Sequence, residues 1–366
     1  MNKLRLACVL IAMIGIHSVS CLADPAVPTP DTLPADPGAS DSNPDLQPTK
    51  IDDQFYQTPT YISALAFSRT SDHVVVGLKD GRIGFFSLGK HIFSTWSDSF
   101  NPSGIEAIDI SPNGNLIAIG TSNQFVQLIN AKTFQDVKTF PIGTNDADGV
   151  LGVAFSPDGL LLAACAEADP GDFSTPRGEV SVWSIKSGIR VCHFYTRTQD
   201  PRNVQFSSDS SRLIAGGDNP TVWDVPRNKL IQVLLNKGDY PSAISPNGRY
   251  VAMTVNGGIY DLKTQTIQQC ALGSLNTIAF TANGSYLVGG SSQDGWAVFD
   301  GKTGKKVVDL QFPDDFGAIS PDGHYIAASS DNLGLDIIKL DIAAFTAPTS
   351  PDLATNSEAP PDKASN

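Results

Sequence analysis

The sequence predicts an all-β protein, a seven-bladed β-propeller of four-stranded antiparallel blades flanked by disordered termini. One segment recurs seven times along the 366 residues: an apolar strand, a tight turn that reads Ser-Pro-Asn-Gly or Ser-Pro-Asp-Gly in four of the copies, and a second apolar strand. The recurrences lie 36 to 51 residues apart, near the period of roughly 40 to 45 expected of four-stranded propeller blades. No segment has the sustained 3.6-residue apolar period of a long amphipathic helix. These observations together favour a closed ring of repeats.

The recurring turn predicts the first two strands of each blade. Its clearest copies are 108–114, 153–159, 243–248 and 318–323, and weaker copies contain Ser68, Ser207 and Thr281. Proline fixes φ at the first turn position, and Asn or Asp followed by Gly supplies residues that tolerate a left-handed φ. Each copy therefore predicts a hairpin of two antiparallel strands.

The third and fourth strands are expected after each hairpin. Apolar and small residues alternate with period two in segments 80–87, 177–184 and 294–300, each of which ends in an aromatic residue followed by Ser or Asp. This pattern is typical of a strand that enters a turn. Segments 189–194 and 306–310 predict fourth strands.

The last repeat lacks a full fourth strand after residues 337–340. We expect residues 53–57, which precede the first repeat, to complete this blade and lock the ring. A closed ring leaves few open sheet edges, which favours a propeller over a sandwich.

The repeats resemble those of the WD-repeat family and its bacterial relatives, across about residues 51 to 345. Val222-Trp223-Asp224 contains the dipeptide that names the family, and Trp183-Ser184, Tyr260-Asp261 and Phe299-Asp300 stand at the equivalent place. The Gly-His pair typical of the family is missing from every repeat, so its buried His-Asp hydrogen bond is not expected. The resemblance implies a platform that binds other proteins or peptides and is not an enzyme.

The two ends of the chain differ from the repeats in composition. Residues 1–23 combine Lys3 and Arg5 with an apolar run over residues 6–16 and then small residues, the layout of a secretory signal peptide. The run is too short to span a bilayer comfortably; a short membrane anchor is the alternative. Residues 24–50 hold seven prolines and no aromatic residue, which predicts a disordered linker. The propeller is expected over 51–346 and a disordered tail over 347–366, in an exported bacterial protein that is periplasmic, envelope-associated or secreted.

Two processing routes fit the end of the signal. Small residues before Asp24 suit ordinary cleavage there, which we favour. Ser18-Val19-Ser20-Cys21 resembles a bacterial lipoprotein box with Cys21 lipidated, although Ser18 stands where leucine is usual. A lipid on Cys21 would be the protein's only link to a membrane.

Charge and cysteine positions limit the partners and cross-links. A chain with a net charge of −13 repels phosphate polymers and anionic membrane surfaces, so no nucleic-acid partner is expected. Cys165 and Cys192 fall on the second and fourth strands of one blade, beyond disulfide reach. We predict a monomer without a disulfide framework.

No catalytic constellation is found in the sequence. It has no Gly-x-Ser-x-Gly elbow and no phosphate-binding loop, and its histidines are not spaced as metal ligands. First strands that should face the central channel, such as 64–66 and 277–279, are apolar and small. We therefore predict no catalytic residue and no cofactor, against the rival hypothesis of a quinoprotein-like or lactonase-like enzyme or cofactor binder.

The third repeat is the longest, and two of its loops are acidic. One loop contains Asp146 and Asp148; the other contains Asp169 and Asp172. Because successive strands reverse direction, both loops are expected at one face of the ring. Carboxylate and carbonyl oxygens are the ligands that Ca²⁺ prefers, which makes Asp146, Asp148 and Asp169 candidate ligands, although the sequence matches only a fragment of a calcium-loop pattern. A solvated loop is the plainer interpretation, and a Ca²⁺-binding structural protein of the envelope is a further alternative.

The same face is predicted to bind partners. Mixed polar loops with a few aromatic residues around a channel can grip peptides or protein edges. The candidate partner-binding residues are Lys79, Arg82, Asp146, Asp148, Glu167, Asp169, Asp172, Arg177, Asp239, Tyr240, Asp294 and Phe316.

Overall fold

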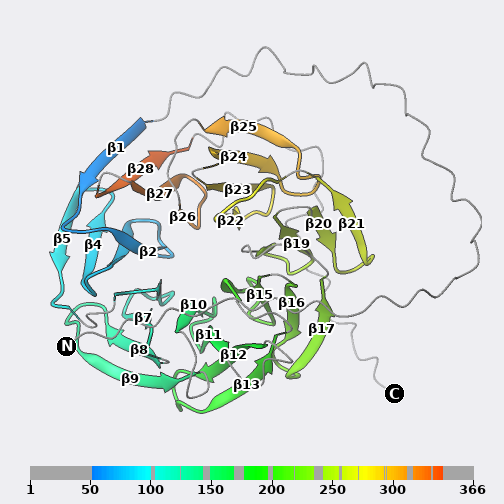
Figure 1. Ribbon diagram of the computed structural model, residues 1–366, viewed down its shortest axis with the longest axis horizontal. Helices are drawn as coiled ribbons and strands as arrows, with labels where there is room; N and C mark the ends of the chain where they lie inside the picture. The colour runs from blue at the N-terminus through cyan, green and yellow to red at the C-terminus, as the bar shows by residue number, and fades with distance from the viewer. Residues whose placement is uncertain are drawn as a thin grey trace, which may run out of the picture. The chain divides into compact units, whose positions relative to one another are not determined.

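The computed structural model confirms the predicted all-β propeller. It describes residues 52–99, 104–123, 125–142, 149–168, 177–196, 201–217, 219–234, 242–254, 258–270, 272–291, 293, 295–310, 316–330 and 333–340. These residues form seven four-stranded antiparallel sheets arranged as the blades of a ring (Figure 1). No helix within these ranges is long and apolar enough to cross a membrane.

The blades follow one another along the chain. Blade 1 contains β2 (Ile62–Phe67), β3 (His73–Leu78), β4 (Ile83–Ser87) and β5 (Ile92–Trp96). Blade 2 contains β6 (Ala107–Ile110), β7 (Leu116–Gly120), β8 (Phe125–Asn130) and β9 (Asp136–Pro141). Blade 3 contains β10 (Val150–Phe155), β11 (Leu161–Ala168), β12 (Arg177–Ser184) and β13 (Arg190–Tyr195). Blade 4 contains β14 (Asn203–Phe206), β15 (Arg212–Gly216), β16 (Thr221–Asp224) and β17 (Lys229–Val233).

The remaining blades repeat this order. Blade 5 contains β18 (Ser242–Ile244), β19 (Tyr250–Met253), β20 (Gly258–Asp261) and β21 (Thr266–Gln269). Blade 6 contains β22 (Thr277–Phe280), β23 (Tyr286–Ser291), β24 (Gly295–Asp300) and β25 (Lys306–Leu310). Blade 7 contains β26 (Gly317–Ile319), β27 (Tyr325–Ser330), β28 (Gly334–Lys339) and, from the start of the chain, β1 (Asp52–Gln57).

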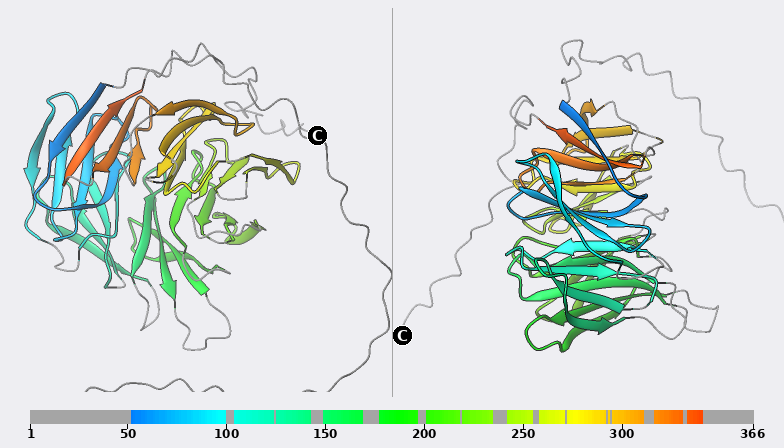
Figure 2. Two further views of the ribbon diagram at one scale, coloured as in Figure 1. Left: turned by 45° about the horizontal axis from the view of Figure 1, so that its top comes forward. Right: turned by 90° about the vertical axis from the view of Figure 1, so that its left-hand side faces the viewer.

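The first strand of each blade faces the centre of the ring. Each first strand contacts the first strands of the two neighbouring blades, and β26 contacts β2 to complete the circle. The fourth strands and β1 lie at the perimeter (Figure 1). Seen from the edge, the strands run across the thickness of the ring (Figure 2).

Strand β1 closes the ring, as the sequence predicts. It pairs antiparallel with β28 along six residue pairs, from Asp52↔Lys339 to Gln57↔Gly334. The Tyr56 ring also lies 4.4 Å from the Phe86 ring of blade 1. Strand β1 therefore connects the last blade to the first.

Aromatic residues of the third strands fill the spaces between blades. Trp183 is 2% exposed, and its ring lies 5.3 Å from that of Phe140 in blade 2. Trp223 stacks on Phe194 of blade 3 at 3.8 Å. Large aromatic surfaces stabilise a fold strongly when they are removed from water, so these contacts hold adjacent sheets together.

The cysteines of blade 3 lie on the strands that the sequence predicts. Cys165 is on β11 and Cys192 is on β13, with β12 between them. Both thiols are free, and burial raises the pKa of each, that of Cys192 to about 11. Neither thiol is therefore activated as a nucleophile.

The two faces of the ring differ in their connections. At one face, five residues separate the first two strands of every blade, from 68–72 in blade 1 to 320–324 in blade 7. We call this the turn face. At the opposite face, the connections vary from three residues (331–333) to ten (97–106). We call it the loop face, and it is the face predicted to bind partners.

A side-chain network fixes the turns between first and second strands. The Ser156 hydroxyl accepts a hydrogen bond from Leu161 N–H at 2.8 Å and donates one to the Asp158 carboxylate at 2.5 Å. Asp158 in turn accepts from Leu160 N–H at 2.9 Å. Equivalent Ser-to-Asn or Ser-to-Asp bonds occur in blades 2, 4, 5 and 7, and Thr281 replaces Ser in blade 6.

One detail of the predicted turn is wrong. Asn and Asp do not adopt a left-handed φ there; the following Gly does, as at Gly159 with a φ of 71°. In blades 1 and 4, which lack this glycine, Ser71 and Ser210 adopt φ values of 55° and 59°. The Asn or Asp is instead selected for its side-chain oxygen, which accepts a backbone N–H.

Replacing Ser156 with Ala should lower the free energy of unfolding by about 1–2 kcal/mol, because a buried N–H loses its acceptor. Urea unfolding measures this change. Ser285→Ala is a matched control, because Ser285 ends the equivalent turn of blade 6 and its hydroxyl bonds to none of the described residues. Equal stabilities of the two variants would contradict the structural role of Ser156.

Candidate functional site

The structure describes part of the predicted binding surface. Lys79, Arg82 and Phe316 are described in full, while Glu167 and Arg177 are placed by the pairing of β11 with β12. The other candidates lie outside the described residues: Asp146, Asp148, Asp169, Asp172, Asp239, Tyr240 and Asp294, as well as Cys21. Within the described residues, no three His, Cys, Asp or Glu side chains gather as a metal site. The calcium hypothesis stays a prediction.

Lys79 lies beside an exposed tyrosine at the loop face of blade 1, and Arg82 ends the same connection, residues 79–82. Lys79 N–H donates to the carbonyl oxygen of Tyr61 at 3.0 Å, and the Tyr61 side chain is 57% exposed. Lys79 Nζ is 3.9 Å from Glu106 Oε2. We call Tyr61, Lys79, Asp80, Arg82 and Glu106 the Tyr61 patch.

The acidic and basic groups of the Tyr61 patch partly neutralise each other. Arg82 donates from Nη2 and Nε to Asp80 Oδ2 at 2.6 and 2.9 Å. These bonds hold the pKa of the Asp80 carboxyl below its usual value. The patch therefore offers an aromatic ring within a mixed field of charges, the composition that is common at protein interfaces.

Phe316 occupies a different environment from the charged candidates. It is half-buried and packs against the apolar cluster between blades 7 and 1, which includes Phe86 and Leu335. Its backbone carbonyl accepts from Ser329 N–H at 2.9 Å. In the sequence, Phe316 stands at the end of a connection between strands. That position alone does not distinguish a packed aromatic side chain from one exposed for binding.

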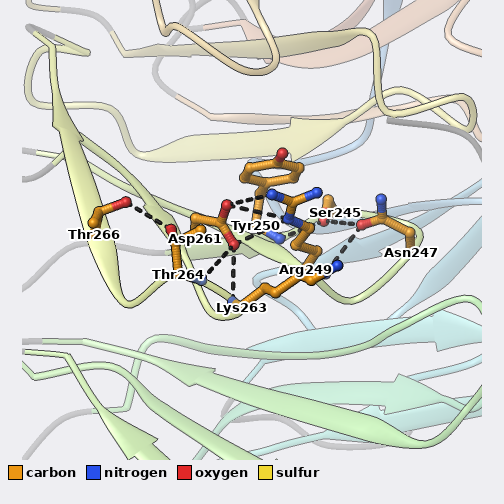
Figure 3. A network of polar contacts seen from close by, with 8 residues as sticks. All are labelled: Ser245, Asn247, Arg249, Tyr250, Asp261, Lys263, Thr264 and Thr266. Carbon is orange, nitrogen blue, oxygen red and sulfur yellow. Dashed lines mark hydrogen bonds and ion pairs between the residues drawn. The ribbon is translucent and has the colours of Figure 1, made fainter. Parts of the chain in front are cut away.

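The polar network of blade 5 in Figure 3 joins two turns on the turn face. Arg249 donates from Nε at 3.0 Å and from Nη2 at 2.7 Å to the two oxygens of Asp261. Asp261 also accepts from Lys263 N–H at 2.8 Å. Burial alone would raise the pKa of Asp261, but these hydrogen bonds outweigh it and lower the pKa to about 2.

This network is structural. The Arg249 guanidinium lies 4.9 Å from the Tyr250 ring centroid. The carboxylate oxygens of Asp261 accept hydrogen bonds from Arg249 and from backbone N–H groups of the turn after β20. Asp224 and Asp300 accept turn N–H groups in the same way, at 2.9 Å from Arg227 and 2.7 Å from Thr303. The Asp that follows the aromatic residue therefore caps a turn in blades 4, 5 and 6.

A cavity of about 400 Å³ occupies the turn-face end of the central channel. Its walls are apolar residues of the first strands, including Leu65, Ile108, Val153 and Val204. The residues at its mouth directly follow the Ser or Thr that begins the turn of a blade: Arg69, Pro157, Ser208, Pro246, Ala282 and Pro321. The cavity is thus enclosed by the most regular part of the ring.

Two polar side chains interrupt the apolar wall at one repeat position. This position, two residues before the turn Ser or Thr, is Ala in five repeats but Asp109 in blade 2 and Gln205 in blade 4. Asp109 Oδ2 accepts from Phe155 N–H at 2.7 Å, and Oδ1 accepts from Ile110 N–H at 2.8 Å. Gln205 Oε1 accepts from Ile244 N–H at 3.0 Å. Each side chain therefore bonds to the first strand of the next blade.

The environment of Asp109 shifts its ionisation. Burial raises the pKa of its carboxyl to about 6, against the opposing effects of its two backbone hydrogen bonds and of the Arg69 charge. Asp109, Gln205 and Arg69 were not predicted from the sequence, because the first strands around them follow the apolar pattern of the repeat. Aligning the seven repeats on their turns would have exposed the departures from Ala and Pro.

Comparisons with known proteins agree with the fold. The family model of the anaphase-promoting complex subunit 4 WD40 domain matches residues 65–156. A WD repeat-containing protein of Synechocystis is 29% identical over 151 residues, which are 39% of this chain and 39% of that protein. Eukaryotic translation initiation factor 3 subunit I of Aspergillus fumigatus is 31% identical over 157 residues, 43% of each chain.

Telomerase protein component 1 of the mouse is also similar, with 29% identity over 150 residues, which are 40% of this chain and 5% of that protein. The matches cover less than half the length of each of these relatives. The ring of seven four-stranded blades, the turn-capping Asp after an aromatic residue and these matches show a β-propeller whose repeats are similar to those of WD-repeat proteins.

Proposed function

We propose that this propeller is a non-enzymatic module that binds another protein or a peptide at its loop face. The observation that carries this proposal is the Tyr61 patch, where an exposed aromatic ring stands among charged groups on the face with the variable connections. Loops on a rigid scaffold commonly carry binding residues because they can vary without disturbing the core.

The chemistry of the patch suits a protein partner. Tyrosine and arginine are enriched among the residues that dominate binding energy at interfaces. The Tyr61 side chain is 57% exposed, so a partner that packs against its ring would remove much of this surface from water. Lys79 and Glu106, which are 3.9 Å apart, can each exchange this long contact for a shorter one across an interface.

We further propose that this binding takes place outside the cytoplasm, in a monomeric bacterial protein. The layout of residues 1–23 supports export, and the net charge of −13 supports a partner other than nucleic acid. Relatives named as subunits of larger assemblies, such as translation initiation factor 3 subunit I, agree with a role in protein association.

A pull-down from bacterial envelope extract tests the proposal. Tyr61→Ala combined with Lys79→Ala should reduce the retention of a specific protein at least tenfold, because the central contacts of an interface contribute on the order of 2 kcal/mol or more each. Quantitative mass spectrometry measures retention. Lys186→Ala combined with Ile189→Ala is a matched control, since these exposed residues lie in a turn-face connection. Loss from the control variant alone would place binding on the other face and refute the proposal.

A further inference from the structure

We propose that the cavity at the turn-face end of the central channel binds a small amphipathic carboxylate. Its apolar part would lie against the first strands, and its carboxylate would pair with Arg69 at the mouth. The site is on the opposite face from the Tyr61 patch, so this inference does not depend on the proposed function.

The size and walls of the cavity suit a small apolar group. Its volume of about 400 Å³ is within the range of roughly 300–1,000 Å³ that is usual for ligand pockets. Aliphatic side chains from β2, β6, β10 and β14 line it. An aliphatic chain that enters this cavity leaves water for an apolar surrounding, which is favourable.

The unpaired polar groups of the cavity are both hydrogen-bond donors. The exposed Arg69 guanidinium has no hydrogen bond or ion pair with the described part of the chain. The oxygen of Gln205 accepts from Ile244 N–H at 3.0 Å, which fixes the orientation of the amide. Its NH₂ group then has no partner among the described residues. Two free donors select a ligand with acceptor oxygens, such as a carboxylate.

The position of Arg69 is specific to one blade. The residue that follows the turn Ser or Thr is uncharged in the other six repeats: Pro112, Pro157, Ser208, Pro246, Ala282 and Pro321. Arg69 therefore gives one side of the mouth a positive charge that the repeat pattern does not require. A guanidinium can bind a carboxylate through two parallel hydrogen bonds.

The acidic side chain of the cavity does not favour a cationic ligand. Asp109 already accepts two backbone N–H groups, at 2.7 and 2.8 Å, and burial raises the pKa of its carboxyl to about 6. Because both of its carboxylate oxygens are already engaged in these hydrogen bonds, an ammonium group would gain little from them. An ammonium would also meet the charge of Arg69.

Three probes with the same eight-carbon chain test the proposal: octanoate, octylamine and octanol. Isothermal titration calorimetry of the full chain at pH 7.5 should give octanoate an affinity at least tenfold higher than that of octylamine or octanol. Tighter binding of octylamine, equal binding of octanol and octanoate, or no saturable binding of octanoate would overturn the proposal.

Two variants locate the site. Arg69→Gln should weaken octanoate binding about tenfold and leave octanol binding unchanged, whereas the control Arg227→Gln should change neither. Arg227 is an exposed arginine at the perimeter side of the same face. Ala279→Leu, which fills part of the cavity wall, should abolish binding of octanoate while the far-ultraviolet circular dichroism stays unchanged. Octanoate binding that survives both Arg69→Gln and Ala279→Leu would refute the site.

The pH dependence gives a further check. Lowering the pH from 7.5 to 5.5 protonates Asp109 and removes its repulsion of the ligand carboxylate, so octanoate should bind several-fold more tightly. Arg69 is the only other ionisable residue that lines the cavity. The strands packed against β6 are β2, β7, β10 and β3; only β3 contributes an ionisable residue, His73, which is paired with Asp72 at 3.0 Å. Asp109→Asn should therefore flatten the pH dependence, and a dependence that persists in this variant would exclude Asp109 as its source.

Discussion

Deletion of β1, residues 52–57, should lower the melting temperature of the protein by about 10 °C or more. The deletion removes the six residue pairs with β28 and the contact of Tyr56 with Phe86. It also leaves β28 as an open sheet edge, which invites pairing with other chains. Several kcal/mol of stabilisation are lost together, because this strand forms the whole outer edge of blade 7 and also packs against blade 1.

Thermal unfolding followed by circular dichroism measures this effect. Deletion of residues 46–51, which is equal in length and directly precedes β1, is the matched control and should leave the melting temperature unchanged. A synthetic peptide of residues 51–59 should restore part of the lost stability by adding back as a strand. Identical melting temperatures of the two deletion variants would show that ring closure does not depend on β1.

The ring could be predicted from the sequence because each blade is specified by short-range chemistry. The Ser-Pro-Asn-Gly and Ser-Pro-Asp-Gly turns mark hairpins, and period-two alternation marks the strands around them. Counting strands shows that the last repeat is one short, and residues 52–57, ahead of Ile62, supply the missing strand. Repeated local signals of this kind reinforce one another, so an unclear copy such as the one at Thr281 does not change the count.

The cavity could not be predicted in the same way because its walls come from all seven blades. Asp109 bonds to Phe155, 46 residues later, and Gln205 bonds to Ile244, 39 residues later. Such contacts depend on how neighbouring blades are placed. The sequence identifies the departure from Ala at these positions, but only the folded ring shows that both side chains bond to the next blade.

The two faces of the ring follow different physical rules. On the turn face, side-chain oxygens satisfy the backbone N–H groups of every first turn, as Ser156 and Asp158 do in blade 3. These turns therefore form a regular rim around the mouth of the cavity, and Arg69 has a defined position in this rim. On the loop face, connection lengths vary, and polar residues such as Lys79 and Arg82 project from them. A rigid rim suits recognition of a small ligand, whereas variable loops suit a larger partner.

Replacing Asp261 with Asn should lower the free energy of unfolding by about 2–3 kcal/mol at pH 7. The lowered pKa of Asp261, about 2 against the ordinary value of 3.8, alone corresponds to about 2 kcal/mol. The substitution also removes the carboxylate charge that pairs with Arg249, which is 23% exposed. Urea unfolding at several pH values measures the cost.

The pH dependence of this cost has a definite sign. Because folding lowers the pKa of Asp261, its contribution is fully present above about pH 4 to 5 and is lost as the pH falls towards 2. The stabilities of the wild-type protein and the Asp261→Asn variant should therefore converge at low pH. Asp309→Asn is the matched control: Asp309 is 61% exposed and 2.7 Å from Lys306, and an exposed pair of this kind contributes little. An equal cost for both substitutions, or a cost of Asp261→Asn that does not change between pH 7 and pH 3, would contradict the assignment of the Arg249 pair as the joint between the two turns of blade 5.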